Sequence, residues 1–338
     1  MFKNFNIIIL TLVALSIIFI PYSNCKSADE INILYFENSG FIETYDNISN
    51  AIDIAENGDT IFVHPGVYCE NFAINKSINL IGSDKNNTII ECQNEEYGLL
   101  VLADQVNISG FTIQNATIGI YLKSSKNTIE NNIFQNNSNA VFIKDTSNNN
   151  VSSNIFKSNT EGIYLYNSTG NNIFKNLILN DSYFGIKFLE KSSKNIFSFN
   201  KITDCIRCIT IDCWSNNNSI SNNNFSTIQE SYCVDIKNSF NNHIFNNSFY
   251  NWSRAITLIK SQNNTINNNK FYNNEVGIFL EDAEFNDVSE DNIFLDNDID
   301  ITTKSKPPSI KIPGFEVSIL IIIAFLIMLI FFFRLRKS

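Results

Sequence analysis

Methionine and histidine are almost absent from this chain of 338 residues, which contains two of each. The methionines, Met1 and Met328, lie in the terminal segments, and the histidines are His64 and His243. Thioether and imidazole groups are side chains that copper and related transition metals select. A metal site of that kind would therefore have to rely on cysteine, and we predict none.

Basic residues and helix-forming patterns are also scarce. The chain has 24 Lys and Arg residues against 34 Asp and Glu residues, and this net charge of −10 argues against nucleic acid as a partner. Between Glu30 and Thr303, only NISNAIDIAENG, residues 47–58, has the apolar spacing of a short helix. Elsewhere apolar and polar residues alternate over very short runs, which is typical of β-strands.

Asparagine, by contrast, is abundant and recurs in a repeated octapeptide. NTIENNIF begins at position 127, and related octapeptides begin at positions 149, 171, 195, 218, 242, 264 and 286. Most units continue with a small residue and a triplet such as Ile-x-Leu, as in GIYL at Gly119 and GIFL at Gly277. A period of about 23 residues, built from short strands and Asn/Gly turns, is typical of the coils of a parallel β-helix. We therefore predict an all-β solenoid of about a dozen coils over residues 29–303.

Stacked coils place equivalent residues above one another, because paired strands lie about 4.8 Å apart. Two inward positions of each coil should then form continuous apolar columns through the core. The first column consists of Ile120, Val141, Ile163, Ile186, Ile209, Val234, Ile256 and Ile278. The second consists of Leu122, Ile143, Leu165, Phe188, Ile211, Ile236, Leu258 and Leu280.

One asparagine position should form a polar column, with Asp291 as its last member. A side-chain amide has both a donor and an acceptor, so stacked amides can hydrogen-bond along the axis and support the bend between strands. We interpret these residues as structural and not catalytic. They are Asn132, Asn154, Asn176, Asn200, Asn223, Asn247 and Asn269. A second, shorter polar column is expected at Asn137, Asn159 and Asp181.

The two chain ends carry the longest apolar runs. The first run follows a lysine and has the length of a signal-peptide core, so we predict a signal peptide at residues 1–28. The second run, residues 317–333, would extend roughly 26 Å as a helix, enough for a transmembrane anchor. A proline-containing linker, 304–316, precedes it. The basic residues of segment 334–338 should remain in the cytoplasm, which places the repeats outside the cell.

Export also agrees with two other patterns in the sequence. The chain contains fourteen N-x-[ST] sequons, including Asn47, Asn115, Asn180 and Asn263, although an asparagine-rich sequence creates sequons by chance. Six cysteines lie in the predicted solenoid, and an even number in an exported chain favours disulfides. The cysteines are Cys69, Cys92, Cys205, Cys208, Cys213 and Cys233.

One cysteine pair has a predicted geometry. Cys208 and Cys233 occupy the same position of neighbouring coils, which places their Cα atoms about 5 Å apart, within the disulfide range. The alternative is that these are free thiols that fill small core positions. A metal or redox role for Cys205-x-x-Cys208 is the weaker interpretation, because a single C-x-x-C is a weak signal.

Two segments, residues 48–82 and VNISGFTIQNATIGIYL at 106–122, together with the repeats, resemble the NosD-like right-handed parallel β-helix proteins. The resemblance extends over residues 31–303 and implies the fold of the carbohydrate-binding and sugar-hydrolase β-helix group, without implying one activity. The family name implies copper delivery, which the scarcity of methionine and histidine disfavours. The tail PGFE, followed by an apolar span and basic residues, resembles the PGF-type sorting signal of archaeal surface proteins. This second resemblance implies a cell-envelope protein that is processed after the motif.

The repeat is least regular over residues 195–253. The coils are longer there, the second polar column is interrupted, and the segment holds four cysteines and both tryptophans. Irregular coils are where a solenoid usually carries function. Asp212 and Asp235, outward carboxylates on adjacent coils, are therefore the candidates for catalysis. The alternative is that Asp212 forms a cross-coil ion pair with Lys237.

Two further surface features are candidates for ligand binding. Tyr121, Phe142 and Tyr164 should form an outward aromatic column on three successive coils, and flat rings suit stacking on sugar faces. The alternative is that this column only stabilises the sheet. The acidic stretch 281–300 offers oxygen ligands for Ca²⁺, although such charge runs more often solvate the last coil and block end-to-end association.

The function favoured by the sequence is a non-catalytic module, anchored in the membrane at the cell surface, that binds envelope glycans or joins surface-layer components. The first alternative is a polysaccharide lyase, hydrolase or epimerase that uses Asp212 and Asp235, but the sequence has no recognisable paired-carboxylate signature of such enzymes. The second alternative is a metal-handling accessory protein. 

Overall fold

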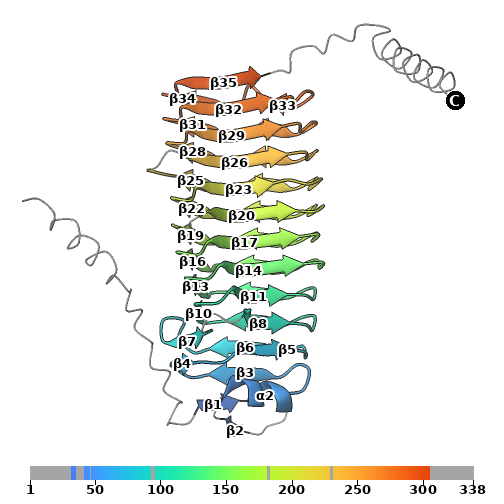
Figure 1. Cartoon of the computed structure of the whole chain (residues 1–338), viewed down its shortest axis with the longest axis vertical. Coiled ribbons are helices and arrows are strands. Elements are labelled where there is room, and N and C mark those ends of the chain that lie inside the picture. The colour runs from blue at the N-terminus through green and yellow to red at the C-terminus, as the bar shows by residue number, and fades with distance from the viewer. Residues whose placement is uncertain are drawn as a thin grey trace, which may run out of the picture.

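The computed structural model describes residues 32–35, 42–45, 47–92, 96–180, 183–228 and 231–304. Most of these residues form a tall stack of coils, and each complete coil contributes one short strand to each of three sheets (Figure 1). Each sheet has eleven parallel strands, so the described chain is a parallel β-helix, as predicted. The coils number eleven, in agreement with the prediction of about a dozen, and the residues before Thr60 form a cap.

The three sheets are named in the order in which a coil visits them. Sheet 1 consists of β3 (Thr60–Val63), β6 (Asn79–Gly82), β9 (Asn107–Ser109), β12 (Thr128–Glu130), β15 (Asn150–Ser152), β18 (Asn172–Phe174), β21 (Ile196–Ser198), β24 (Ser219–Ser221), β27 (His243–Phe245), β30 (Thr265–Asn267) and β33 (Asp287–Val288). Sheet 2 consists of β4 (Gly66–Tyr68), β7 (Thr88–Glu91), β10 (Thr112–Gln114), β13 (Ile133–Gln135), β16 (Ile155–Lys157), β19 (Leu177–Leu179), β22 (Lys201–Thr203), β25 (Asn224–Ser226), β28 (Ser248–Tyr250), β31 (Lys270–Tyr272) and β34 (Ile293–Leu295). Sheet 3 consists of β5 (Phe72–Ile74), β8 (Tyr97–Val101), β11 (Ile118–Leu122), β14 (Asn139–Lys144), β17 (Glu161–Tyr166), β20 (Phe184–Leu189), β23 (Arg207–Ile211), β26 (Tyr232–Lys237), β29 (Arg254–Ile259), β32 (Val276–Glu281) and β35 (Ile299–Lys304).

A small cap closes the N-terminal end of the stack. It contains the antiparallel pair β1 (Asn32–Tyr35) and β2 (Ile42–Tyr45) and the predicted short helix, α2 (Ile48–Ile54). Asn47 caps the helix, because its Oδ1 accepts the N–H of Asn50 at 2.8 Å. The apolar face of the helix is buried, so it covers the end of the core that would otherwise be open.

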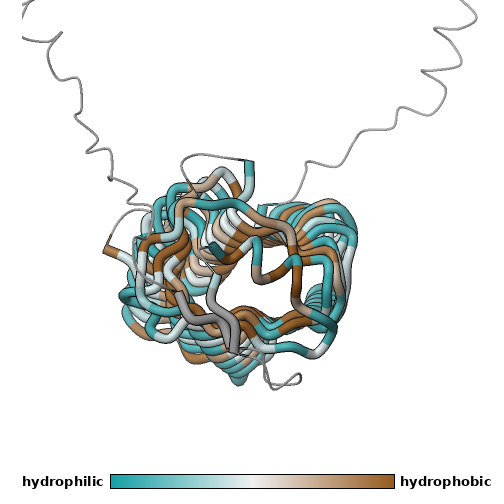
Figure 2. The backbone as a smooth tube through the Cα atoms, turned by 90° about the horizontal axis from the view of Figure 1, so that it is seen from below, coloured by the Kyte–Doolittle hydropathy of each residue, from teal (hydrophilic) through white to brown (hydrophobic). Residues whose placement is uncertain are grey.

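The core contains the two predicted apolar columns. Ile120 pairs with Val141 and Leu122 pairs with Ile143, and the same register continues strand by strand to β35. A further inward column, from sheet 2, holds stacked phenyl rings whose centroids lie 4.8 to 5.1 Å apart. Seen along the axis, hydrophobic and hydrophilic positions of successive coils form continuous bands (Figure 2). The stacked rings are those of Phe134 on Phe156, and of Phe225, Phe249, Phe271 and Phe294 in series.

The predicted asparagine column lines the corner between sheets 1 and 2. The backbone N–H of each member donates to Oδ1 of the member in the next coil, over 2.8 to 3.0 Å. Each Nδ2 donates to a backbone carbonyl of the preceding coil, as Asn223 does to Phe197. These amides are buried and satisfy the backbone groups that the turn leaves without a strand partner.

The last member of this column is Asn292, and the prediction of Asp291 was wrong. Asn269 donates its N–H to Oδ1 of Asn292 at 2.9 Å. Ile266 pairs with Val288, and Asn269 bonds to Asn292. The segment from Val288 to Asn292 is therefore one residue longer than the segment from Ile266 to Asn269. The extra residue moves Asp291 out of the column.

The structure contains two more polar columns that the sequence analysis did not identify. The first residues of the octapeptides from Asn127 to Asn264 are buried, and each donates its N–H to Oδ1 of the equivalent asparagine in the next coil over 2.8 to 2.9 Å. Three residues earlier lies a column of buried hydroxyls. The signal was present, because both positions recur once per coil. The hydroxyl column consists of Ser124, Thr146, Ser168, Ser192, Ser215, Ser239 and Ser261.

Left-handed backbone explains the second use of asparagine. In most coils the residue just before each column asparagine has a positive φ, as Asn131 (54°) and Asn246 (55°) do. Asparagine tolerates this conformation better than most residues. Each corner therefore needs one residue in the left-handed region and one inward amide, and Asn-Asn serves both needs.

The predicted signal peptide, the transmembrane segment and all but the first residue of the linker lie outside the described residues. Within the described part of the chain, the only helix is α2, and no helix there is long and apolar enough to cross a membrane.

Candidate functional site

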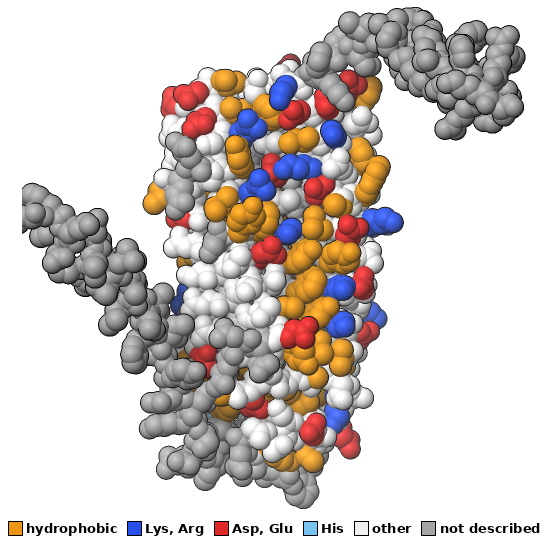
Figure 3. Space-filling model, viewed as in Figure 1, with side chains coloured by type: hydrophobic (Ala, Val, Ile, Leu, Met, Phe, Trp, Pro, Cys, Tyr) orange, Lys and Arg blue, Asp and Glu red, His pale blue; other side chains and the backbone are white. Residues whose placement is uncertain are grey.

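The outer face of sheet 3 carries the aromatic column. Tyr121, Phe142 and Tyr164 are in register, with ring centroids 5.0 and 4.7 Å apart and ring planes inclined by 13° and 16°. Burial, followed by the nearby Glu161 carboxylate, raises the pKa of Tyr164 to about 12. Because stacked rings cover part of one another, the column offers a ligand the ring edges and only part of each face. In Figure 3 hydrophobic side chains form a strip along this face.

Beyond Tyr164 the same column changes from aromatic to polar. The Nζ atom of Lys187 lies 5.0 Å from the centroid of the Tyr164 ring and 3.3 Å from Oε1 of Glu161. The aromatic strip therefore passes directly into a charged region on the next coils. After Lys187 the column continues with Thr210, Asp235, Thr257 and Phe279.

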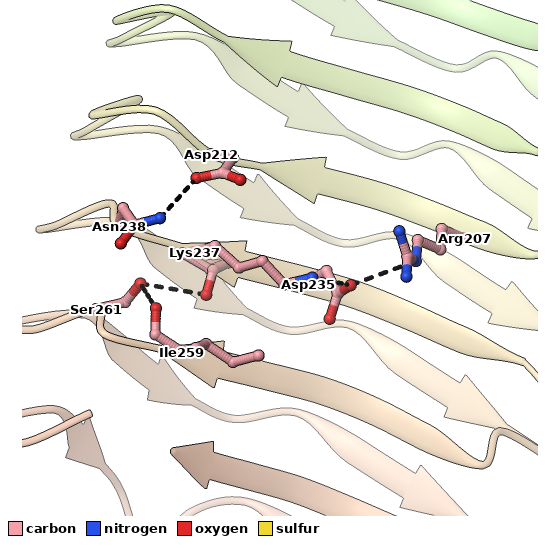
Figure 4. Close-up of polar contacts among 8 residues, drawn as sticks. Arg207, Asp212, Asp235, Lys237, Asn238, Ile259 and Ser261 are labelled. Carbon is pink, nitrogen blue, oxygen red and sulfur yellow. Dashed lines mark hydrogen bonds and ion pairs between the residues drawn. The ribbon is translucent and has the colours of Figure 1, made fainter. Parts of the chain in front are cut away.

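Asp235 is held by two cations and is almost inaccessible. Its Oδ2 atom lies 3.4 Å from Nε of Arg207 and 3.2 Å from Nζ of Lys237, and the residue is 4% exposed (Figure 4). The prediction that Lys237 pairs with Asp212 was wrong. Asp235 and Lys237 are two residues apart on one strand, so both side chains leave the same face of the sheet.

Asp212 has partners different from those of Asp235. It follows β23, and its Oδ1 accepts the N–H of Cys213 at 2.6 Å and a proton of Asn238 Nδ2 at 3.1 Å (Figure 4). Because Ile211 pairs with Ile236, Asp212 is level with Lys237 and two positions along the strand from the level of Asp235. Each carboxylate is thus engaged by its own neighbours, Asp235 by two cations and Asp212 by two hydrogen bonds.

The predicted disulfide partners are close but are free thiols. Cys208 and Cys233 are fully buried, occupy equivalent positions of β23 and β26, and hydrogen-bond to each other through their thiols. Burial raises the pKa of both thiols, so they stay protonated and unreactive. They fill the column that holds Gly119 and Ala140 elsewhere, where only small side chains fit. Of the six predicted disulfide cysteines, Cys69 is disulfide-bonded, and the free ones are Cys92, Cys205, Cys208, Cys213 and Cys233.

The irregular segment interrupts the polar column of Asn137 and Asn159, which lies at the corner before sheet 3. Asn137 bonds to Asn159 as predicted, whereas Asp181 lies outside the described residues. Cys205, Thr227 and Trp252 then occupy the corner, and the column resumes when Trp252 donates its N–H to Asn274. A shallow pocket lies at this break, lined by Thr227, Ile228, Asn251, Trp252, Ser253, Asn273 and Glu275.

Metal ligands do not gather in the described part of the chain. No three His, Cys, Asp or Glu side chains there are placed to hold one ion, and this includes the acidic stretch 281–300 considered for Ca²⁺. His64 is exposed, and His243 Nε2 is hydrogen-bonded to Asn267 at 2.8 Å.

A family model described as Periplasmic copper-binding protein (NosD) matches residues 52–232 and 213–310, which together cover more than half of the chain. The described residues do not fit the copper that this description implies, because they bring no three His, Cys, Asp or Glu side chains together around one point, and the paired thiols of Cys208 and Cys233 are buried. A cell surface glycoprotein of Methanothermus fervidus is 34% identical over 129 residues, which is 37% of this chain and 21% of that protein. The chain thus spans about a fifth of the length of this relative.

Solved structures with the same architecture include a DFA-IIIase and an alginate lyase. The DFA-IIIase of Arthrobacter chlorophenolicus A6 has a TM-score of 0.59 at 14% identity, over 80% of this chain and 82% of that chain. The alginate lyase of Paenibacillus sp. str. FPU-7 has a TM-score of 0.52 at 15% identity, over 75% of this chain and 96% of that chain. At such low identity the likeness shows the fold alone.

Proposed function

Because this chain belongs to the NosD family of proteins, with a parallel β-helix as its fold, we propose that it is an exported cell-surface protein that binds glycans without cleaving them. The binding surface is the outer face of sheet 3. The similarity to a cell surface glycoprotein and the periplasmic description of the family support the location. The predicted C-terminal anchor would hold the solenoid at the membrane.

The continuous outward column of sheet 3 is the observation that carries this proposal. Over eight residues, from Tyr121 to Phe279, it places four rings, one cation, two hydroxyls and one carboxylate in one line along the axis. An extended glycan has alternating apolar C–H patches and polar groups, and a line of this kind matches both. A flat, open face suits a polymer better than a small molecule.

An enzymatic role is not favoured by the geometry. Glycoside hydrolysis needs two carboxyl groups that face one bond, and one of them must accept or donate a proton. Asp235 is bound to two cations, and Asp212 belongs to a neighbouring loop. A structural role in the envelope remains the second candidate, favoured by the relatedness to a cell surface glycoprotein.

A screen of polysaccharides that scores both binding and cleavage tests the proposal. We expect binding without cleavage, and we expect Phe142→Ala to weaken binding about tenfold, which corresponds to about 1.4 kcal/mol. Tyr272→Ala is the matched control, because Tyr272 stacks on Tyr250 at 4.9 Å in the same way but on sheet 2. Cleavage that Asp235→Asn abolishes would replace the proposal with the enzymatic one. A folded protein that binds no glycan would favour the structural role.

A further inference from the structure

The outer face of sheet 3 has a second half that differs from the aromatic column. Over β20 to β32, cationic side chains alternate with aromatic rings, and Figure 3 shows basic groups among the hydrophobic side chains of this face. We call this region the cation–aromatic patch and define it by Lys187, Arg207, Tyr232, Lys237, Arg254 and Phe279.

Arg254 is the central residue of the patch. Its guanidinium carbon lies 3.9 Å from the centroid of the Phe279 ring and 5.4 Å from that of Tyr232. The rings come from the coils on either side, so they fix the plane of the guanidinium. No carboxylate of the described residues lies within ion-pair distance of Arg254, whereas Arg207 and Lys237 share Asp235. The positive charge of Arg254 is therefore held in place by the two rings but is not paired with a carboxylate of the described residues.

The charge of the patch is opposite to that of the whole chain. On β23, β26 and β29, Arg207, Lys237 and Arg254 supply three positive charges and Asp235 one negative charge, which leaves +2. The complete chain has a net charge of −10. A local positive surface on an acidic protein attracts anions to one place and not to the surface in general.

Two hydroxyl groups beside Asp235 have no hydrogen-bond partner. The Oγ1 atoms of Thr210 and Thr257 are buried and unpaired, and the residues are 6% and 2% exposed. Both flank Asp235 in the register. A buried hydroxyl without a hydrogen-bond partner is unfavourable. This part of the face therefore has hydrogen-bonding groups that its own side chains do not satisfy.

We propose that the cation–aromatic patch binds a carboxylate-bearing sugar of an acidic glycan, with Arg254 as the residue that recognises the carboxylate. A guanidinium held flat by rings presents its forked N–H groups to a carboxylate with little loss of side-chain freedom. The inference rests on the proposed function and specifies the ligand class at the same face. Tyr164 and Arg254 lie four strand spacings apart, about 19 Å, so the ligand is an oligosaccharide and not a single sugar.

Calorimetry with two oligosaccharides of equal length, an oligogalacturonate and a neutral glucan, tests the proposal on the full-length chain. We expect the oligogalacturonate to bind more tightly, with an affinity that falls as salt is raised. Arg254→Ala should weaken its binding at least tenfold and Arg254→Lys by less, because lysine keeps the charge but loses the fork. Lys270→Ala, which removes one positive charge from sheet 2, is the matched control and should change affinity less than twofold.

The outcomes separate this inference from the proposed function. Equal affinity for the two oligosaccharides, or an Arg254→Ala variant that binds the oligogalacturonate normally, overturns the acidic-ligand assignment but leaves glycan binding intact. Absence of binding to either oligosaccharide and to every glycan in the screen overturns both. The thermal midpoint of Arg254→Ala and its binding of the neutral glucan verify that a loss of affinity is not a loss of folding.

A second inference rests on a different observation, the position of the sequons. None of the fourteen sequon asparagines is buried, and none belongs to the three asparagine columns. None lies within a strand of sheet 3 either. The sequon asparagines are Asn47, Asn75, Asn86, Asn107, Asn115, Asn136, Asn150, Asn167, Asn180, Asn217, Asn224, Asn246, Asn251 and Asn263.

The fold explains this separation. Two residues after an asparagine of the first two columns comes an inward Ile, Val or Phe, so the third sequon position cannot be Ser or Thr. An exposed corner asparagine with positive φ is followed by the column residue and then by an outward residue, as in Asn246-Asn247-Ser248. Corner positions and outward strand positions of sheets 1 and 2, such as Asn107, Asn150 and Asn224, therefore supply sequons, whereas positions of the first two columns do not.

We infer that the exposed members of this set, which are all but the half-buried Asn47, Asn107 and Asn115, are the acceptors of N-linked saccharides and that the outer face of sheet 3 stays free of them. In the transfer, Nδ2 forms a bond to the anomeric carbon of a lipid-phosphate-linked saccharide. The bond between that carbon and the phosphate oxygen breaks, the phosphate leaves with its electron pair, and the amide nitrogen loses one proton. Attached saccharides would border the proposed binding face and leave it accessible.

Mass spectrometry of glycopeptides from the protein isolated from its native cells tests this inference. We expect saccharides at exposed corner positions such as Asn246 and Asn263 and none at Asn247 or Asn264. Asn263→Gln should remove the saccharide from its peptide without changing the others. A saccharide on a column asparagine, or unmodified asparagine at all fourteen sequons, overturns the inference.

Discussion

The asparagine-lined corners and the outer face of sheet 3 are built from the same coil, yet they tolerate different residues. At the corner between sheets 1 and 2, asparagine occupies one position in every coil from Asn132 to Asn292. On the outer face of sheet 3, the equivalent column changes from Tyr to Lys to Thr to Asp over a few coils.

The difference shows which positions of a coil can change their side chain, and so their ligand contacts, without loss of structure. A corner amide serves backbone groups of two coils at once, so any other side chain leaves them unpaired. An outward strand position has its backbone satisfied by the sheet, and its side chain only meets neighbours above and below. Recognition can therefore vary on the face without disturbing the corner, and the predictions that follow test this contrast.

The largest effect is expected in the core. Phe249→Ala removes a fully buried ring that stacks on Phe225 and Phe271 at 5.0 and 5.1 Å. We expect the free energy of unfolding to fall by about 3–5 kcal/mol, because the transfer term and the cavity add. Tyr272→Ala, an outward stacked ring on β31, should cost much less in the same denaturant titration. Similar losses for the two variants would contradict the inward placement of the Phe column.

A corner asparagine should follow in size. Asn223→Ala removes the acceptor of the Asn200 N–H and the donor to Phe197, and we expect a loss of about 1–3 kcal/mol. Asn224→Ala is the matched control, because the next residue is exposed and points outward; it should cost within about 0.5 kcal/mol. Equal denaturant midpoints for Asn223→Ala and Asn224→Ala would show that the column is not structural.

On the outer face, the two candidate carboxylates should differ from each other. Asp235→Asn leaves Arg207 and Lys237 without their carboxylate, and we expect a loss of about 1–2 kcal/mol, discounted because both cations are partly solvated. Asp212→Asn keeps an acceptor for its neighbours and should change stability by less than about 0.5 kcal/mol. Thermal unfolding of the two variants decides it. A larger effect from Asp212→Asn would reverse the assignment of the structural ion pair.

The smallest effect concerns the two buried thiols and pH. Burial raises the pKa of Cys208 and Cys233 above the usual 9.0. The folded chain therefore keeps these protons where the unfolded chain loses them, so the contribution is complete below pH 9 and is lost as pH rises above it. Between about pH 8 and pH 10.5, the thermal midpoint under reducing conditions should fall more in the unmodified protein than in Cys208→Ala/Cys233→Ala. Alanine fits this column, as Ala140 and Ala255 show. Parallel curves would mean that the thiols titrate normally.

The architecture and much of the core could be predicted because a solenoid turns sequence period into spatial register. Ile120, Val141 and their equivalents stack as their spacing predicted, since each coil adds one strand to each sheet. The aromatic column of Tyr121, Phe142 and Tyr164 was found in the same way. The column that starts at Asn127 recurs once per coil as well, but recurrence alone does not show that a polar side chain points inward.

The candidate site was predicted less well, because it depends on where side chains meet and not on when they recur. Arg254 lies at the same register position as Tyr232, yet its contact with Phe279 depends on side-chain direction across two coils. The partner of Lys237 was mispredicted for the same reason. The register places Lys237 beside Asp212 of the adjacent coil, whereas the observed ion pair joins Lys237 to Asp235, two residues earlier on the same strand.

The sequence by itself determined the period, the strand faces and the positions of the inward amides, because a coil that pairs with identical neighbours must repeat its inward pattern. Only the tertiary structure decided which outward groups are matched and which are not. Asp235 is neutralised and Arg254 is not, although both are charged residues on neighbouring strands. Long side chains on an open sheet reach over more than one coil, so their partners are set by direction and competition, which no repeat encodes.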